Sequence, residues 1–107
     1  MVPQSPTRGK VLVALGANCP GPWGRPAETI AYALGRIEEN SIRVCAVSPL
    51  YVTRAIGNAR QPAYVNAVAV LDTTLSPESL LRVLKAVERE SFPQRVQPVC
   101  ATRLLTP

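Results

Sequence analysis

The stretch YVNAVAVLDT, residues 64–73, predicts a β-strand whose two faces differ in chemistry. Successive side chains of a strand point to opposite sides, so residues two apart share a face. One face of this strand is entirely apolar and carries Val65, Ala67, Ala69 and Leu71. The other face carries Tyr64, Asn66, Val68 and Val70, so it places an aromatic ring and an amide side by side.

The residues after this strand predict a helix, and those before it predict a long strand. Ser76-Pro77-Glu78 combines an N-cap residue with proline at the first helical position, and an apolar stripe follows at Leu80, Leu81, Leu84 and Val87. Residues 42–53 are rich in β-branched side chains but include Pro49. A central strand tolerates proline poorly, so we expect an edge or a bulge at that point.

The first forty residues predict one further strand and one further helix. The apolar run KVLVAL, residues 10–15, is ended by Gly16-Ala17-Asn18 and is typical of a buried strand followed by a turn. Pro26 suits a first helical turn, and apolar residues then recur at helical spacing at Ala27, Ile30, Ala31, Leu34 and Ile37. The expected order is strand, helix, strand, strand, helix.

Composition restricts the chemistry of this 107-residue chain. It has no histidine and a single aspartate, Asp72, which excludes a histidine-activated nucleophile, an imidazole metal ligand and a paired-aspartate magnesium site within one copy. The net charge is +5, but the arginines are spread evenly and aromatic residues are few. A solvated basic surface therefore explains the charge better than a nucleic-acid partner does.

Cysteine usage and hydropathy favour a cytoplasmic protein without membrane contact. Cys19, Cys45 and Cys100 are far apart and have no histidine beside them, so we expect thiols in a reducing compartment and no zinc site. The opening residues lack the apolar core of a signal peptide, and no apolar run approaches the ~20 residues of a membrane span.

Five stretches carry a resemblance to a known family. They are VALGAN (13–18), VSPLYVT (47–53), QPAYVNAV (61–68), TLSPESLL (74–81) and VER (87–89). In this order and at this spacing they resemble the first half of the 6-hydroxymethyl-7,8-dihydropterin pyrophosphokinases of folate biosynthesis. The resemblance covers residues 10–90 and implies a ferredoxin-like α+β fold, a β-α-β-β-α antiparallel sheet with helices on one face. A last strand is not recognisable, so we expect a flexible segment over 1–9, a domain over 10–90 and an atypical proline-rich tail over 91–107.

The same resemblance implies a site for a pterin. Enzymes of the family are diphosphotransferases that use ATP and magnesium, and the matching positions that would line the pterin pocket here are Thr53, Ala55, Ile56, Tyr64 and Asn66. Tyr64 would stack on the ring and Asn66 would hydrogen-bond its polar edge, which suits a flat bicycle with donors and acceptors on one rim. From the residues alone, outward-facing positions on a half-exposed strand explain Tyr64 and Asn66 better, and the family match reverses this preference. Lys85 and Glu88 match helix positions that contact the nucleotide.

The metal-binding half of the family's site has no counterpart in these residues. Its signature, Arg-x-x-Asp-x-Asp, is absent, so we assign no catalytic residue and no metal ligand. We expect a protein that binds a pterin at most and is inactive alone. An enzyme completed by carboxylates of a partner chain, a non-catalytic self-associating or interaction protein, and a truncated or frame-shifted product remain alternatives. The tail makes the last alternative a serious one, because residues 91–107 have no acidic side chain and no regular pattern.

The missing last strand also raises a question of assembly. Without it, the strand over 10–15 has an unpaired edge, which natural proteins rarely leave exposed. Residues 99–105 could fold back onto this edge, or two copies could pair there as a symmetric homodimer. We favour a dimer or a higher oligomer.

Overall fold

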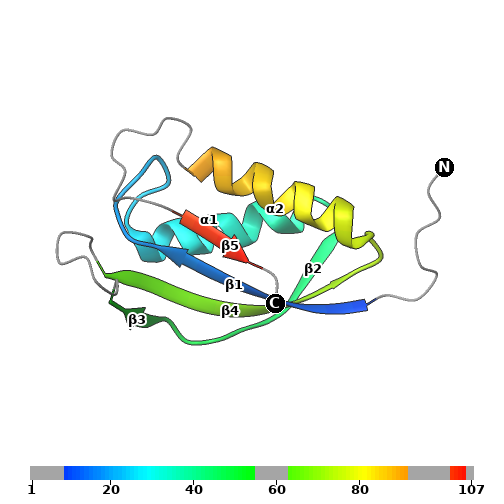
Figure 1. Ribbon diagram of the computed structural model, residues 1–107, viewed down its shortest axis with the longest axis horizontal. Helices are drawn as coiled ribbons and strands as arrows, with labels where there is room; N and C mark the ends of the chain where they lie inside the picture. The colour runs from blue at the N-terminus through cyan, green and yellow to red at the C-terminus, as the bar shows by residue number, and fades with distance from the viewer. Residues whose placement is uncertain (1–8, 55–62, 92–101, 106–107) are drawn as a thin grey trace.

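The computed structural model describes residues 9–54, 63–91 and 102–105. Its elements follow the order β1 (Gly9–Ala17), α1 (Pro26–Glu38), β2 (Ile42–Val47), β3 (Tyr51–Thr53), β4 (Tyr64–Thr73), α2 (Pro77–Ser91) and β5 (Thr102–Leu105). Both helices lie over the same face of one antiparallel sheet (Figure 1). The expected α+β fold with helices on one face is therefore confirmed.

Strand β4 is the centre of the sheet. The order is β2-β4-β1-β5, and β3 also pairs with β4. The pairing of β4 with β1 runs without interruption from Thr73 opposite Gly9 to Val65 opposite Ala17. The alternating stretch 64–73 thus has a strand on each side along its length, and β2 and β3 share one of those sides.

The long strand expected over 42–53 is divided in two around Pro49. Proline has no N–H to donate to a ladder, and β2 ends at Val47 before β3 begins at Tyr51. Ser48 bridges the break, because its N–H donates to the carbonyl of Val68 at 2.8 Å and its Oγ accepts the N–H of Val68 at 2.8 Å. A register shift also occurs earlier, between Val44 and Ala46.

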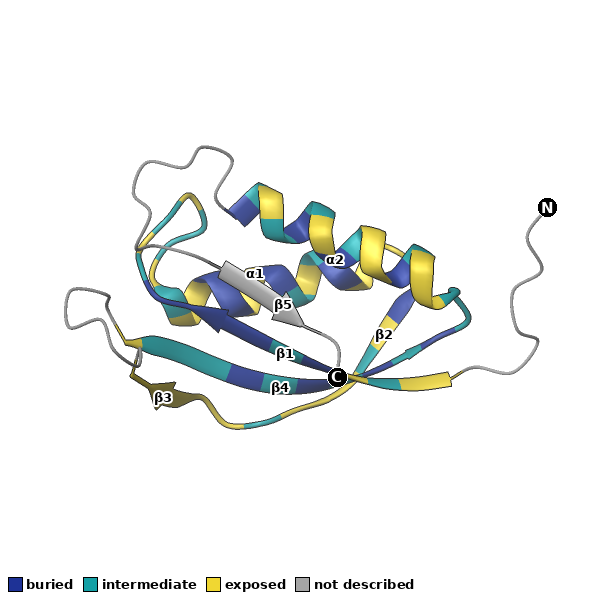
Figure 2. Cartoon of the chain, viewed as in Figure 1, coloured by how far each residue is buried: buried dark blue, intermediate teal, exposed yellow. Residues whose placement is uncertain are grey.

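The core fills the space between the helices and one face of the sheet (Figure 2). It includes the predicted apolar face of β4, with Ala67, Ala69 and Leu71 fully buried. The helices contribute Ile30, Ala33, Ile37, Leu80, Leu84 and Val87. Three residues of the predicted stripes, Ala27, Ala31 and Leu81, are instead exposed, because they lie on the margins of their helices beyond the contact with the sheet.

Residues near the end of the chain form the last strand, β5, which the sequence offered only as one of two possibilities. Thr102–Leu105 pair antiparallel with Ala17–Ala14, on the side of β1 away from β4. This pairing is the first of the two expected ways to cover the edge of β1, because it satisfies backbone groups that would otherwise lie unpaired. It covers Ala14–Ala17, and the β5 ladder does not reach Gly9–Val13.

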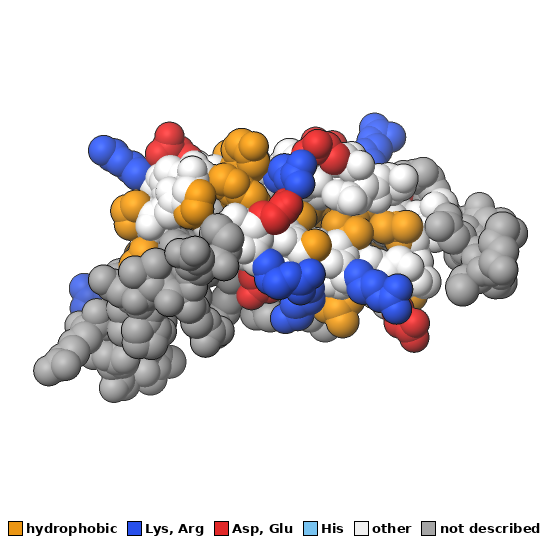
Figure 3. All heavy atoms as spheres, turned by 90° about the horizontal axis from the view of Figure 1, so that it is seen from above, with side chains coloured by type: hydrophobic (Ala, Val, Ile, Leu, Met, Phe, Trp, Pro, Cys, Tyr) orange, Lys and Arg blue, Asp and Glu red, His pale blue; other side chains and the backbone are white. Residues whose placement is uncertain are grey.

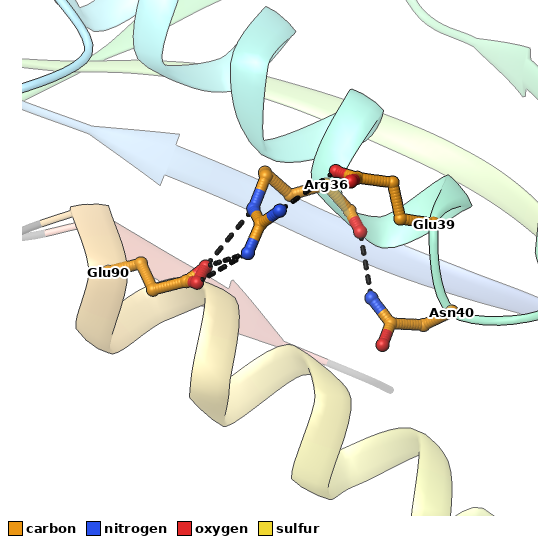
Figure 4. A network of polar contacts seen from close by, with 4 residues as sticks. All are labelled: Arg36, Glu39, Asn40 and Glu90. Atoms are coloured by element: carbon orange, nitrogen blue, oxygen red, sulfur yellow. Dashed lines mark hydrogen bonds and ion pairs between the residues drawn. The ribbon is translucent and has the colours of Figure 1, made fainter.

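An arginine on α1 connects the two helices (Figure 4). The Arg36 guanidinium donates to both carboxylate oxygens of Glu90 on α2, with Nη2 at 2.7 Å from each, and its Nη1 donates to Glu39 at 3.0 Å. The hydrogen bond to Glu90 and the charge of Glu39 raise the pKa of Arg36. Both side chains of the Arg36–Glu90 pair are more than a third exposed, so the pair contributes little to stability.

The surface and the cysteines complete the description of the fold. On the helix-bearing side, cationic, anionic and apolar side chains are interspersed (Figure 3). None of the described helices is long and apolar enough to cross a membrane.

The cysteines differ from one another. Cys45 is a free thiol, as expected, and is exposed. Cys19 is disulfide-bonded, so the expectation of free thiols throughout was wrong.

Candidate functional site

Tyr64 and Asn66 project from the face of the sheet opposite the helices. Their neighbours on β4, Val65 and Ala67, pack toward the helical core, and strand alternation turns Tyr64 and Asn66 the other way. Both side chains are partly exposed. The predicted sharing of one face by the ring and the amide is thus present in the structure.

The Asn66 amide is held in one orientation by neighbouring oxygens. Its Nδ2 donates to Thr53 Oγ1 at 2.9 Å and to the carbonyl of Tyr64 at 3.2 Å, and it lies 3.4 Å from the carbonyl of Tyr51. An amide oxygen in that position would face two carbonyl acceptors, so the nitrogen must occupy it. The two N–H groups of the Asn66 side chain are therefore used within the protein, and Oδ1 is its acceptor atom.

Thr53 enters this site from β3, whose residues pair directly with β4. Thr53 lies opposite Tyr64 and Tyr51 lies opposite Asn66 in the ladder. Side chains directly opposite on neighbouring strands share a face, so three of the five predicted pterin-site residues come together here. The remaining two, Ala55 and Ile56, lie outside the described residues.

Gly16 completes the group, although the sequence assigned it to a turn after the first strand. Strand β1 continues to Ala17, and Gly16 is the ladder partner of Asn66. It is buried, and the atoms nearest to the position of a Cβ on Gly16 are Asn66 Oδ1 and the ring of Tyr64. A glycine inside a strand often marks such a close approach, which is the signal that could have identified it.

Lys85 and Glu88 lie on α2, in the helical layer and across the sheet from Asn66. Their side chains approach one another at 3.8 Å, from Lys85 Nζ to Glu88 Oε2. That oxygen is buried, and it has no hydrogen-bond partner within the described part of the chain. The structure therefore separates the two predicted groups. Thr53, Tyr64 and Asn66 lie on the open face of the sheet, and Lys85 and Glu88 lie in the helical layer on its other face.

The described residues do not fit a magnesium site. Over 9–54 and 63–91, no three acidic, histidine or cysteine side chains gather closely enough to hold a metal ion. Asp72 stands six positions along β4 from Asn66, about 20 Å at the rise of a strand. Its ladder partners are two cationic residues, Lys10 and Arg43. No catalytic step through a metal follows from these residues.

Comparison with known proteins places these features in a family. Residues 12–105 match the family model of 7,8-dihydro-6-hydroxymethylpterin-pyrophosphokinase. The chain belongs to this pyrophosphokinase family. The match extends past residue 90, where the resemblance ends, and so includes β5.

Three bacterial relatives carry the name 2-amino-4-hydroxy-6-hydroxymethyldihydropteridine pyrophosphokinase. The Pseudomonas aeruginosa protein is 46% identical over 82 residues, which are 76% of this chain and 48% of that protein. The Pseudomonas putida protein is 37% identical over 82 residues, 76% of this chain and 64% of that protein. The Haemophilus influenzae protein is 37% identical over 79 residues, 73% of this chain and 47% of that protein. The matches therefore span less than two thirds of each relative.

Proposed function

We propose that this chain binds a 6-hydroxymethylpterin on the open face of its sheet and that these 107 residues alone do not transfer pyrophosphate. The observation that carries the proposal is the fixed amide of Asn66 beside the ring of Tyr64. A pterin is a flat bicycle whose polar edge carries N–H groups. The Tyr64 ring offers it a stacking surface, and Asn66 Oδ1 offers an acceptor for an N–H on that edge.

Thr53 would support this site indirectly, and Ala55 and Ile56 would line it through the loop after β3. Thr53 uses its hydroxyl to accept from Asn66, so it orients the amide and need not touch the ligand itself. The membership of the chain in a pterin pyrophosphokinase family supports the choice of a pterin over other flat heterocycles.

Glu88 and Lys85 would contribute to nucleotide contacts on the helical side. The buried Oε2 of Glu88 is an acceptor that lacks a donor among the described residues, and a buried carboxylate oxygen without a donor is unfavourable. A nucleotide N–H or hydroxyl would supply one. The lysine at 3.8 Å keeps this carboxylate paired in the absence of a ligand.

The absence of transfer by the chain alone rests on its carboxylates. Phosphoryl-transfer enzymes position their metal ions with closely spaced acidic side chains, and this sequence holds one aspartate, on β4 far from the amide of Asn66. Transfer would then require acidic residues beyond those of this sequence.

Calorimetric titration with 6-hydroxymethylpterin, with and without a magnesium nucleotide, tests both parts. We expect binding of the pterin and no formation of a pyrophosphorylated product by the isolated chain. A folded protein that binds no pterin would overturn the site, and turnover by the chain alone would overturn the proposed lack of transfer.

Self-association is the second candidate function, and β5 reduces the part of the β1 edge that a dimer could use. Because β5 occupies Ala14–Ala17, a homodimer through the edge of β1 would use residues 9–13. Size-exclusion chromatography with light scattering tests self-association, and a monomer at all concentrations would contradict it. The pairing of β5 with β1 and the family match through residue 105 favour a tail that belongs to the domain over one read in another frame.

A further inference from the structure

Gly16 occupies a position where backbone conformation does not require glycine. Among the described glycines only Gly24 has a positive φ, so Gly16 has a backbone that other residues can adopt. Glycine weakens a strand, because it loses more conformational freedom on folding and offers no side chain for packing. Its presence inside the β1–β4 ladder therefore needs a steric explanation.

That reason lies in the two side chains above it. A Cβ on Gly16 would lie 2.9 Å from Asn66 Oδ1 and 3.3 Å from Tyr64 Cδ1. The first distance is shorter than folded proteins allow for a carbon and an oxygen, and the second is tighter than an ordinary contact. A side chain at this position would therefore displace the amide, the ring or both.

The amide cannot yield without cost. Its Nδ2 is held by Thr53 Oγ1 at 2.9 Å and by the carbonyl of Tyr64 at 3.2 Å, so rotating Oδ1 away from β1 would lengthen or break these bonds. The carbonyl of Tyr64 belongs to the same residue whose ring approaches Gly16. The Asn66 amide and the Tyr64 ring thus both depend on the space left by the missing side chain of Gly16.

From this geometry we infer that Gly16 is a positioning residue that selects the ligand by lacking a side chain. It lets the Asn66 amide and the Tyr64 ring lie close against β1, which leaves a shallow surface for a planar heterocycle that donates an N–H to Oδ1. The inference rests on the proposed pterin site and adds to it a residue that touches no ligand and acts through Asn66 and Tyr64.

The test compares Gly16→Ala with a matched control on the same strand. Gly9→Ala adds the same methyl group to β1 where nothing lies within 4 Å of the new Cβ. We expect Gly16→Ala to weaken binding of 6-hydroxymethylpterin about tenfold, the scale of one lost hydrogen bond, and Gly9→Ala to change it less than about twofold. Equal affinities of wild type and Gly16→Ala would overturn the inference while leaving the proposed function intact.

Two further measurements need no ligand. In a nuclear magnetic resonance spectrum, the side-chain amide signal of Asn66 should shift in Gly16→Ala and stay unchanged in Gly9→Ala. In thermal melts, the loss of stability caused by Gly16→Ala should shrink in an Asn66→Ala background, where the oxygen at 2.9 Å is gone. An unshifted Asn66 signal, or an equal loss in both backgrounds, would overturn the inference.

Two outcomes separate this inference from the proposed function and from misfolding. A wild-type protein that binds no pterin overturns the proposed function and the ligand selection, and the Asn66 signal then decides the positioning role alone. If Gly16→Ala does not fold, the double variant Gly16→Ala/Asn66→Ala should fold. If both variants fail to fold, the clash of the new Cβ with the Tyr64 ring at 3.3 Å is the dominant one, which would overturn the inferred role of Gly16 in positioning Asn66.

Discussion

The Nδ2 atom of Asn66 donates to Oγ1 of Thr53 at 2.9 Å and so links the centre of the sheet to its short outer strand. This contact orients the amide whose other atom, Oδ1, would accept from a ligand. Thr53→Val removes the acceptor while keeping the branched shape. We expect pterin affinity measured by calorimetry to fall by about 0.5–1.5 kcal/mol, the usual net value of one hydrogen bond. Thr53→Ser retains the hydroxyl and should bind like wild type, and a loss in both variants would point to packing instead.

Truncation of Asn66 itself should have a larger effect. Asn66→Ala removes the acceptor and leaves the ligand N–H and Thr53 without their partner, so we expect a loss of about 1–3 kcal/mol in pterin affinity by calorimetry. Asn40→Ala is the control, because Asn40 donates to the Arg36 carbonyl at the end of α1 and is far from the site. Unchanged affinity in Asn66→Ala would show that the assignment of this site is wrong.

Tyr64 should contribute through its ring. Tyr64→Phe keeps a stacking surface and should retain most of the affinity, whereas Tyr64→Leu should lose about 0.5–1.5 kcal/mol beyond the loss of contact area. Quenching of intrinsic protein fluorescence on titration with the pterin measures the dissociation constants of both variants. The idea of a stacked ring fails if leucine and phenylalanine behave alike.

The stability of the helical layer should depend on which face of α2 is changed. Leu84 is fully buried, and Leu84→Ala should lower the free energy of unfolding by about 2–5 kcal/mol in urea titrations. Leu81, on the same helix, is 46% exposed, and Leu81→Ala should stay within about 0.5 kcal/mol of wild type. Similar losses at both positions would contradict the packing of α2.

The Arg36–Glu90 pair should matter less to stability and should respond to salt. Arg36→Gln removes the two short contacts to Glu90 but leaves polar groups on an exposed surface. We expect a small drop in melting temperature at low ionic strength that shrinks at high salt, because screening weakens exposed pairs. A large drop in melting temperature that persists at high salt would show that the Arg36–Glu90 pair stabilises the fold more than its exposed position predicts.

Local patterns were sufficient to predict the main elements. The alternation in 64–73 predicted β4 and its two faces, and the Ser76-Pro77-Glu78 start predicted the beginning of α2, because these features depend on spacing along the chain. The division around Pro49 was anticipated only as an irregularity. How the strand continues beyond it depends on Ser48, whose pairing with Val68 joins residues far apart in the sequence.

The sequence offered β5 as one of two ways to cover the edge of β1, and it could not decide between them for the same reason. Residues 99–105 were only weakly strand-like, and Thr102–Leu105 forms a ladder because the edge of β1 is available for pairing. The preference for a dimer assumed that this edge lacked a partner within the chain, and β5 supplies one for Ala14–Ala17.

By itself the sequence determined which chemical groups the protein has: an aromatic ring and an amide on one face of a strand, one aspartate and no histidine. The sequence also determined the family, because the five stretches that resemble it are recognisable along the chain without the structure. Only the tertiary structure decided how the amide is oriented, because Thr53 and Gly16 lie on two other strands and meet Asn66 through the register of the sheet. Register depends on pairing between residues far apart in the sequence. That pairing brings Thr53 and Gly16 next to Asn66 and so determines which atom of the amide, Oδ1, is the acceptor.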